Sequence, residues 1–143
     1  MLIYTVSALV DLYDATEGMF WTRNDNWNNG GDPCAEQARW FGLTCVCQGG
    51  EQCHVMGLEL TANNLAGTIP PSIGGLSRLL NFKLAGNVHL QGTIPSSISR
   101  FSLLLSLELQ RCSLEGPIPE SIGLLSSMQL LCDLAFSWYT ALF

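Results

Sequence analysis

Hydrophobic residues recur at a fixed spacing through the second part of the chain. Twenty of the 24 leucines lie in residues 55–143, and only four lie before them. Three segments there share the order apolar-x-apolar-x-x-Asn or Cys, and they start at Leu58, Phe82 and Leu107. Each is followed by a Gly-x-Ile-Pro tetrapeptide, which starts at Gly67, Gly92 and Gly116, so the pattern repeats after 25 and then 24 residues. A period of this length predicts a solenoid of stacked coils.

The alternation within each segment predicts the two faces of a short strand. Leu58 and Leu60 enter the core while Glu59 faces outward, because successive side chains of a strand point to opposite sides. One coil cannot bury its own edges, so neighbouring coils stack and their strands align in parallel as a sheet on the concave side. Apolar positions after each proline continue the core on the convex side, and they are Ile73, Leu76, Leu79, Ile98, Phe101, Leu104, Ile122, Leu125 and Met128.

The frame Leu58-x-Leu60-x-x-Asn63-x-Leu65-x-Gly67 resembles the leucine-rich repeat, and its Gly-x-Ile-Pro continuation is similar to the plant-type subclass. The resemblance covers residues 55 to about 134. Upstream, the segment Trp40–Cys45 beside Pro33-Cys34 resembles the cysteine-containing N-terminal cap of that family. It implies an α/β solenoid, a right-handed superhelix with a parallel concave sheet, a second short sheet at the Gly-x-Ile-Pro segments and a helical, disulfide-bearing cap. Residues 1–54 would form the cap and residues 55–143 the repeats.

The resemblance also assigns the asparagines of the frame. Asn63 and Asn87 are expected to turn inward and to hydrogen-bond backbone groups where each strand bends, and Cys112 stands at the same place in the third copy. The second copy carries one inserted residue in this turn. A fourth copy is degenerate, because neither an asparagine nor Gly-x-Ile-Pro follows Leu109 at the next interval. We interpret the tail as a closing coil or a truncated end.

The first residues predict a short amphipathic helix. Val6, Leu9, Val10 and Tyr13 share one stripe, and Gly18 is expected to close the helix as its left-handed residue. No signal peptide is identified in residues 1–10, because a basic start and a cleavage site are missing. No membrane span is assigned to residues 124–143 either, since an aspartate lies near the middle of that stretch.

Four cysteines, Cys34, Cys45, Cys47 and Cys53, fall within twenty residues. Their spacing does not follow the paired arrangement of zinc sites, so disulfides are the favoured interpretation and no metal is expected. The residues alone leave all three pairings of four cysteines open. The family's cap implies a bridge from Cys34 to Cys45, which leaves Cys47 and Cys53 to pair around a Gly-Gly turn. Cys112 and Cys132 are expected to stay reduced.

Charge narrows the choice of partners. Six basic and twelve acidic side chains give a net charge of −6, which removes the attraction that drives binding to nucleic acids and anionic membranes. No phosphate-binding loop, nucleophile elbow or zinc-protease motif is present, and the two histidines, His54 and His89, have plain structural explanations. The sequence therefore predicts a protein that is not an enzyme and needs no cofactor.

The outward positions of the strands are the candidate binding site. The resemblance implies a concave surface that binds a protein or peptide ligand, with contacts from Glu59, Thr61, Asn81, Lys83, Glu108, Gln110 and Arg111. The alternative is that Glu59, Lys83 and Glu108 only pair with one another across neighbouring strands.

Three functions follow from this interpretation. The first is a secreted or cell-surface recognition module, non-catalytic and of the receptor-like or inhibitor-like kind. The second is the N-terminal ectodomain fragment of a leucine-rich-repeat receptor kinase. The third is a truncated repeat protein without a ligand of its own.

Overall fold

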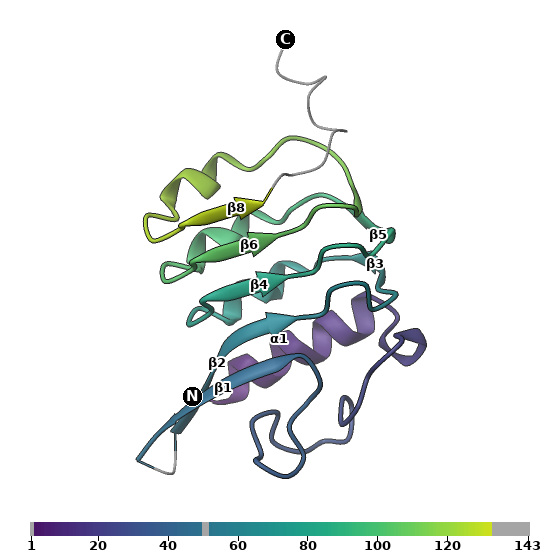
Figure 1. Cartoon of the computed structure of the whole chain (residues 1–143), viewed down its shortest axis with the longest axis vertical. Helices are drawn as coiled ribbons and strands as arrows, with labels where there is room; N and C mark the ends of the chain where they lie inside the picture. The colour runs from purple at the N-terminus through teal and green to yellow at the C-terminus, as the bar shows by residue number, and fades with distance from the viewer. Residues whose placement is uncertain (1, 50–51, 133–143) are drawn as a thin grey trace.

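A computed structural model describes residues 2–49 and 52–132. The chain starts with helix α1 (Leu2–Ala15) and the short 3-10 helix η1 (Gly18–Phe20), and an irregular segment then leads to strands β1 (Leu43–Gln48) and β2 (Gln52–Glu59). These elements form one end of the molecule, and the coils of the repeat stack above them (Figure 1). No helix within the described ranges is both long enough and apolar enough to cross a membrane.

The concave sheet has five strands in the order β1-β2-β4-β6-β8, where the last three are β4 (Asn81–Lys83), β6 (Ser106–Glu108) and β8 (Leu130–Cys132). The first pair is antiparallel and all the others are parallel. Leu58 aligns with Phe82 and Phe82 with Leu107, which is the register that the repeat predicts. The boundary expected after residue 54 falls inside β2, so a single strand joins the cap to the first repeat.

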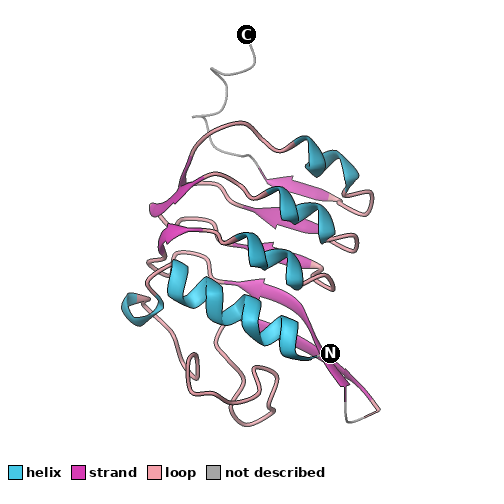
Figure 2. Ribbon diagram, turned by 180° about the vertical axis from the view of Figure 1, so that it is seen from behind, coloured by secondary structure: helices cyan, strands magenta, loops and turns pink. Residues whose placement is uncertain are grey.

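A second sheet of three parallel strands lies at the other end of the coils, in the order β3 (Ala66–Thr68), β5 (His89–Gly92) and β7 (Ser113–Leu114). Three 3-10 helices then cover the convex side, η2 (Pro71–Gly75), η3 (Ser96–Arg100) and η4 (Glu120–Leu124) (Figure 2). A proline precedes or starts each of them, where its fixed φ suits the first turn. This sequence of strand, strand and short helix confirms the predicted leucine-rich-repeat solenoid.

One continuous core runs through the cap and the coils. The strand residues Leu58, Phe82 and Leu107 are at most 1% exposed. The convex residues Ile73, Leu79, Ile98, Phe101 and Leu104 are buried equally well. The inward assignment of these positions is therefore correct. Residues 133–143, on which the degenerate part of the fourth coil falls, lie outside the described residues.

Asparagine side chains tie each coil to the one before it. The Asn87 carboxamide oxygen accepts hydrogen bonds from the backbone N–H groups of Asn63 and Leu65, at 2.9 and 3.1 Å. Its nitrogen donates to the carbonyls of Leu60 and Leu84, at 2.9 and 2.6 Å. Asn63 makes the same kind of pair with the backbone N–H and carbonyl of Arg23 in the cap. The inward role expected for both asparagines is confirmed.

Cys112 stands in place of the asparagine in the third coil and makes one of the corresponding hydrogen bonds. Its thiol donates to the carbonyl of Leu84 at 3.2 Å. Burial raises the pKa of the Cys112 thiol, so the group keeps its proton at neutral pH and remains a donor. A thiol has one weak donor where a carboxamide has two strong donors and an acceptor, so this link is weaker than that of Asn87. The side chain of Cys132 lies outside the described part of the chain.

Helix α1 packs on the first coil through a wider face than the sequence predicts. Ala8, Leu9 and Leu12 are buried, while the predicted Val6, Val10 and Tyr13 pack on the edge of the core. The left-handed residue after the helix stands one position before the glycine, because Glu17 and not Gly18 takes this conformation, with φ 55°. Gly18 is needed for another reason, since a Cβ there would collide with the ring of Tyr13.

Four aromatic rings hold the irregular segment of the cap in place. Trp27 lies against three others, with ring centroids 6.0 Å from Tyr13, 4.9 Å from Trp21 and 5.0 Å from Trp40. The indole nitrogens of Trp21 and Trp27 donate to backbone carbonyls at 2.9 Å. This cluster forms the cap part of the hydrophobic core, which continues into the coils.

Two disulfides close the cap. They join Cys34 to Cys45 and Cys47 to Cys53, which is the pairing implied by the family. Each closes a short loop, with sequence separations of 11 and 6, and should add about 2 to 3 kcal/mol of stability by restricting the unfolded chain.

Replacing Gly67 by alanine should destabilise the protein about 1 to 3 kcal/mol more than the same change at Gly92. Both glycines have left-handed φ, 101° and 78°, at the same place in successive coils. A Cβ at Gly67 would meet the carbonyl oxygen of Ala15 in the backbone of α1, whereas one at Gly92 would meet only the methyl group of Thr68. Urea unfolding of the two variants measures the difference, and equal losses would show that the end of α1 moves aside.

Candidate functional site

The outward side chains of the concave sheet form rows that run across the strands. Pairing of β2, β4 and β6 aligns Glu59 with Lys83 and Lys83 with Glu108. Backbone hydrogen bonds continue the ladder beyond the strand ends, from Leu60 N–H to the Lys83 carbonyl and from Ala62 N–H to the Ala85 carbonyl, both at 2.8 Å. The rows therefore extend to the positions after the strands.

The central row is held together by its own charges. The Lys83 ammonium lies 3.8 Å from a carboxylate oxygen of Glu59 and 3.5 Å from one of Glu108. The Glu108 carboxylate also accepts a hydrogen bond from the Ser106 hydroxyl at 3.3 Å. The lysine side chain is 27% exposed and the Glu108 side chain 20%, so this row is a partly covered ion-pair network. The pairing that the sequence offered as an alternative to ligand binding is thus present.

Not every outward position is accessible. Gly57, Ala85 and Ser106 stand at outward positions of the strands, but all three are buried. Gly57 lies under Thr44 of β1, whose side chain occupies the space in front of it. Small side chains in a sheet are covered by their larger neighbours, so these positions shape the surface without offering groups to a ligand.

The positions after the strand ends are more open. Thr61 after β2 and Arg111 after β6 are exposed, and Gln110 is half-buried, as is Asn81 at the start of β4. Arg111 has a φ of 58°, as Ala62 does at 50°, because both stand where the chain turns out of the concave sheet. The side-chain amide oxygen of Gln110 is buried and has no hydrogen-bond partner within the described residues, whereas the backbone carbonyl of Gln110 accepts a hydrogen bond from the N–H of Gly86. These residues carry polar groups that the network around Lys83 does not use.

The cap adds residues to this surface that the repeat pattern does not reveal. The guanidinium of Arg23 lies 3.9 Å from the centre of the Phe41 ring and forms a 2.9 Å salt bridge with Asp25. Phe41 precedes Gly42, whose carbonyl accepts a hydrogen bond from the N–H of Glu59. The cap segment therefore borders the first strand of the repeats. The Trp-Phe-Gly motif indicated a cap in the sequence, but it did not indicate that Phe41 lies beside the rows of the concave sheet.

The two histidines do not form a common site. His54 lies in β2 of the concave sheet and His89 starts β5 of the second sheet. The side chains of the concave rows are charged, amide and hydroxyl groups, and neither histidine lies among Glu59, Thr61, Asn81, Lys83, Glu108, Gln110 and Arg111.

Comparisons with known proteins agree with this architecture. The Leucine Rich Repeat family model matches residues 103–125. The LRR receptor-like serine/threonine-protein kinase GSO2 of Arabidopsis thaliana is 39% identical over 105 residues, which are 73% of this chain and 8% of that protein. Receptor-like protein 6 of the same plant is 34% identical over 119 residues, which are 81% of this chain and 11% of that protein. The chain thus spans about a tenth of the length of these relatives.

Solved structures show the same fold. A plant ice-binding protein superposes with a TM-score of 0.77 at 28% identity, over 92% of this chain and 40% of that one. A chain of the BIR3–SERK2 complex from Arabidopsis thaliana gives 0.72 at 27% identity, over 87% and 64%. The fold is that of a leucine-rich-repeat ectodomain. The chain belongs to the plant-type leucine-rich repeat proteins with a cysteine-containing N-terminal cap.

Proposed function

We propose that this chain is a non-catalytic recognition module that binds a protein or peptide on its concave surface. The observation that carries the proposal is the set of polar groups beside the Lys83 network, because Thr61 and Arg111 are exposed and Arg111 makes no salt bridge within the described residues. The network itself fixes the shape and charge of the surface at its centre. Binding energy would then come from the less constrained neighbours.

The proposed contact residues keep the set expected from the repeat, namely Glu59, Thr61, Asn81, Lys83, Glu108, Gln110 and Arg111. Charges alternate along this surface, so a ligand with both signs of charge would fit better than a strongly acidic or basic one. An extended peptide laid across the strands could meet several rows at once. The Arg23–Phe41 pair would border such a ligand on the cap side.

We further propose that the protein acts outside the cell. The two disulfides of the cap are stable in an oxidising compartment and would be at risk in the cytosol. Receptor-like relatives support the more specific alternative that the chain is the N-terminal part of the ectodomain of a receptor kinase. A repeat protein without its own ligand is the remaining alternative, and the self-paired charges of the central row favour it.

A binding panel tests the proposal. The purified chain would be titrated by biolayer interferometry against secreted plant peptides and leucine-rich-repeat ectodomains. For any partner found, Arg111→Ala and Thr61→Ala should each weaken binding about threefold to thirtyfold, because they remove groups from the surface without disturbing the core. Arg100→Ala, on the convex side, is the matched control and should leave the affinity unchanged. A stronger effect of the control, or no binding by any candidate, would favour one of the alternatives.

A further inference from the structure

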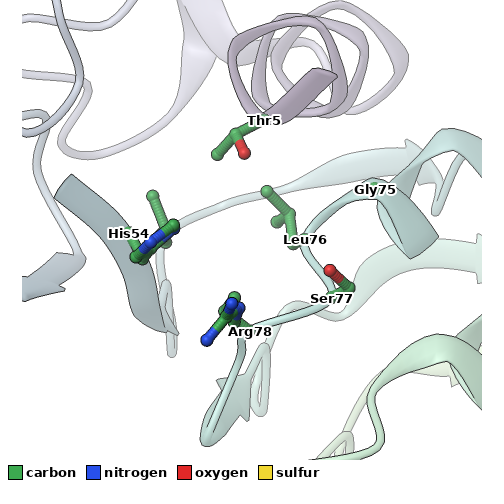
Figure 3. Close-up of a pocket in the computed structure, with 7 residues that line it drawn as sticks. Thr5, His54, Gly75, Leu76, Ser77 and Arg78 are labelled. Carbon is green, nitrogen blue, oxygen red and sulfur yellow. The ribbon is translucent and has the colours of Figure 1, made fainter. Parts of the chain in front are cut away.

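A hollow lies between the cap helix and the first convex turn, and none of its residues belongs to the concave rows. It has a volume of about 160 Å³. Thr5 of α1 borders it on one side, His54 and Val55 of β2 on another, and residues 75–78 after η2 on the third (Figure 3).

The hollow exists because a helix replaces a coil at this place. Farther along the solenoid each convex turn rests on the turn before it, and the hydroxyl of Ser127 donates to the carbonyl of Ser102 at 3.1 Å. Ser77 occupies the same position in the first coil, 25 residues earlier, but α1 lies where the preceding coil would be. A straight helix cannot follow the bend of a coil, so a space remains beside Ser77.

Hydrogen-bond donors surround this space. Thr5 and Ser77 supply hydroxyl groups, His54 an imidazole and Arg78 a guanidinium, and Figure 3 shows them arranged on different sides of the hollow. Neither Arg78 nor His54 takes part in a salt bridge within the described residues. Arg78 is exposed, so its stability contribution as a packing residue is small.

The lining has an unusual charge for this protein. The chain carries twice as many acidic as basic side chains, yet no carboxylate is among the described residues that border the hollow. Its floor is apolar, since Val55 and Leu76 are 3% and 2% exposed. A low-polarity floor strengthens the interaction of an anion with the guanidinium above it.

We propose that this hollow binds a tetrahedral oxyanion, that is, a phosphate or sulfate group. A guanidinium can bind two of its oxygens at once, and donors on other sides can bind the remaining ones. A planar carboxylate would present its oxygens in one plane and would leave donors on the other sides unused. The free anion and a phosphate or sulfate group at the end of a larger molecule share this chemistry, and the experiment below distinguishes the two sources.

Nuclear magnetic resonance tests the proposal on the full chain labelled with ¹⁵N. Inorganic phosphate and phenyl phosphate would be titrated separately, with sodium chloride keeping the ionic strength constant. Shift changes should centre on the amides of Thr5, His54, Ser77 and Arg78. Arg78→Gln should weaken binding about tenfold or more, because it removes a charge-assisted bidentate contact. The matched control, Arg100→Gln on the next coil, should bind as the wild type does.

Each outcome bears on the proposal. Tighter binding of phenyl phosphate would support the site and identify a larger ligand as its source, whereas equal binding would support the free anion. Thr5→Val provides a second variant, which should weaken binding while leaving the amide spectrum of the coils unchanged. Shifts centred on other arginines, or an equal loss for Arg100→Gln, would overturn the proposal. The test is independent of the concave-surface function.

Discussion

Replacing Asn87 by alanine should cost about 3 to 5 kcal/mol of unfolding free energy. The side chain is 1% exposed and makes four hydrogen bonds to backbone groups of two coils. Alanine would leave buried N–H and carbonyl groups without partners at the place where the chain bends. Such a loss is a large fraction of the stability of a small domain.

Urea unfolding followed by circular dichroism measures this loss. Asn87→Cys should fall between the wild type and the alanine variant, because the third coil shows that a thiol can supply one of the bonds. Asn81→Ala provides the control, since Asn81 is a half-buried residue on the outward side of β4 and its loss should stay within about 0.5 kcal/mol. Similar losses for Asn81 and Asn87 would contradict the structural role of the turn asparagine.

Replacing Leu84 by alanine should destabilise the protein by about 2 to 5 kcal/mol. This leucine is fully buried, with coils on both sides, so the cavity that alanine leaves cannot easily close. The neighbouring Lys83→Ala should cost less than about 1 kcal/mol, because it removes only partly exposed ion pairs.

Equilibrium unfolding of the two variants compares adjacent positions with opposite orientation. The lysine loses more side-chain atoms than the leucine, so a larger loss of stability at Leu84 reports burial rather than size. Equal losses would mean that the side chains do not alternate between core and surface as the structure places them. A salt titration separates the contributions further, since only the loss at Lys83 should shrink at high ionic strength.

The repeats could be predicted from the sequence because their information is periodic. Leu58, Phe82 and Leu107 recur with the same neighbours, and each neighbour then fixes the face of the strand on which it lies. The same argument brought Glu59, Lys83 and Glu108 into one row. The pattern does not tell whether these three side chains pair with one another or contact a ligand, because that depends on side-chain distances.

The presence of the cap could be predicted from the sequence, but the packing of its residues could not. Trp27 contacts rings from three other segments, and no spacing rule connects residues that meet through irregular backbone. The left-handed residue after α1 was predicted at Gly18, but it is Glu17, and a glycine is needed at position 18 because a Cβ there would collide with the ring of Tyr13. Burial of Ala85 and Ser106 depends on the bulk of side chains in adjacent strands, which the repeat pattern does not contain.

The turn asparagines all hydrogen-bond toward the N-terminal side of the solenoid, and this bears on how such proteins change during evolution. Asn87 serves the coil before it, and Asn63 serves the cap in the same way. A segment from one asparagine to the next is therefore a repeating structural unit. The backbone groups at its turn are hydrogen-bonded by the asparagine of the unit that follows. Duplication of the unit that carries Asn87 would preserve every bond of this kind. The length of the array can thus vary between relatives while the cap stays the same.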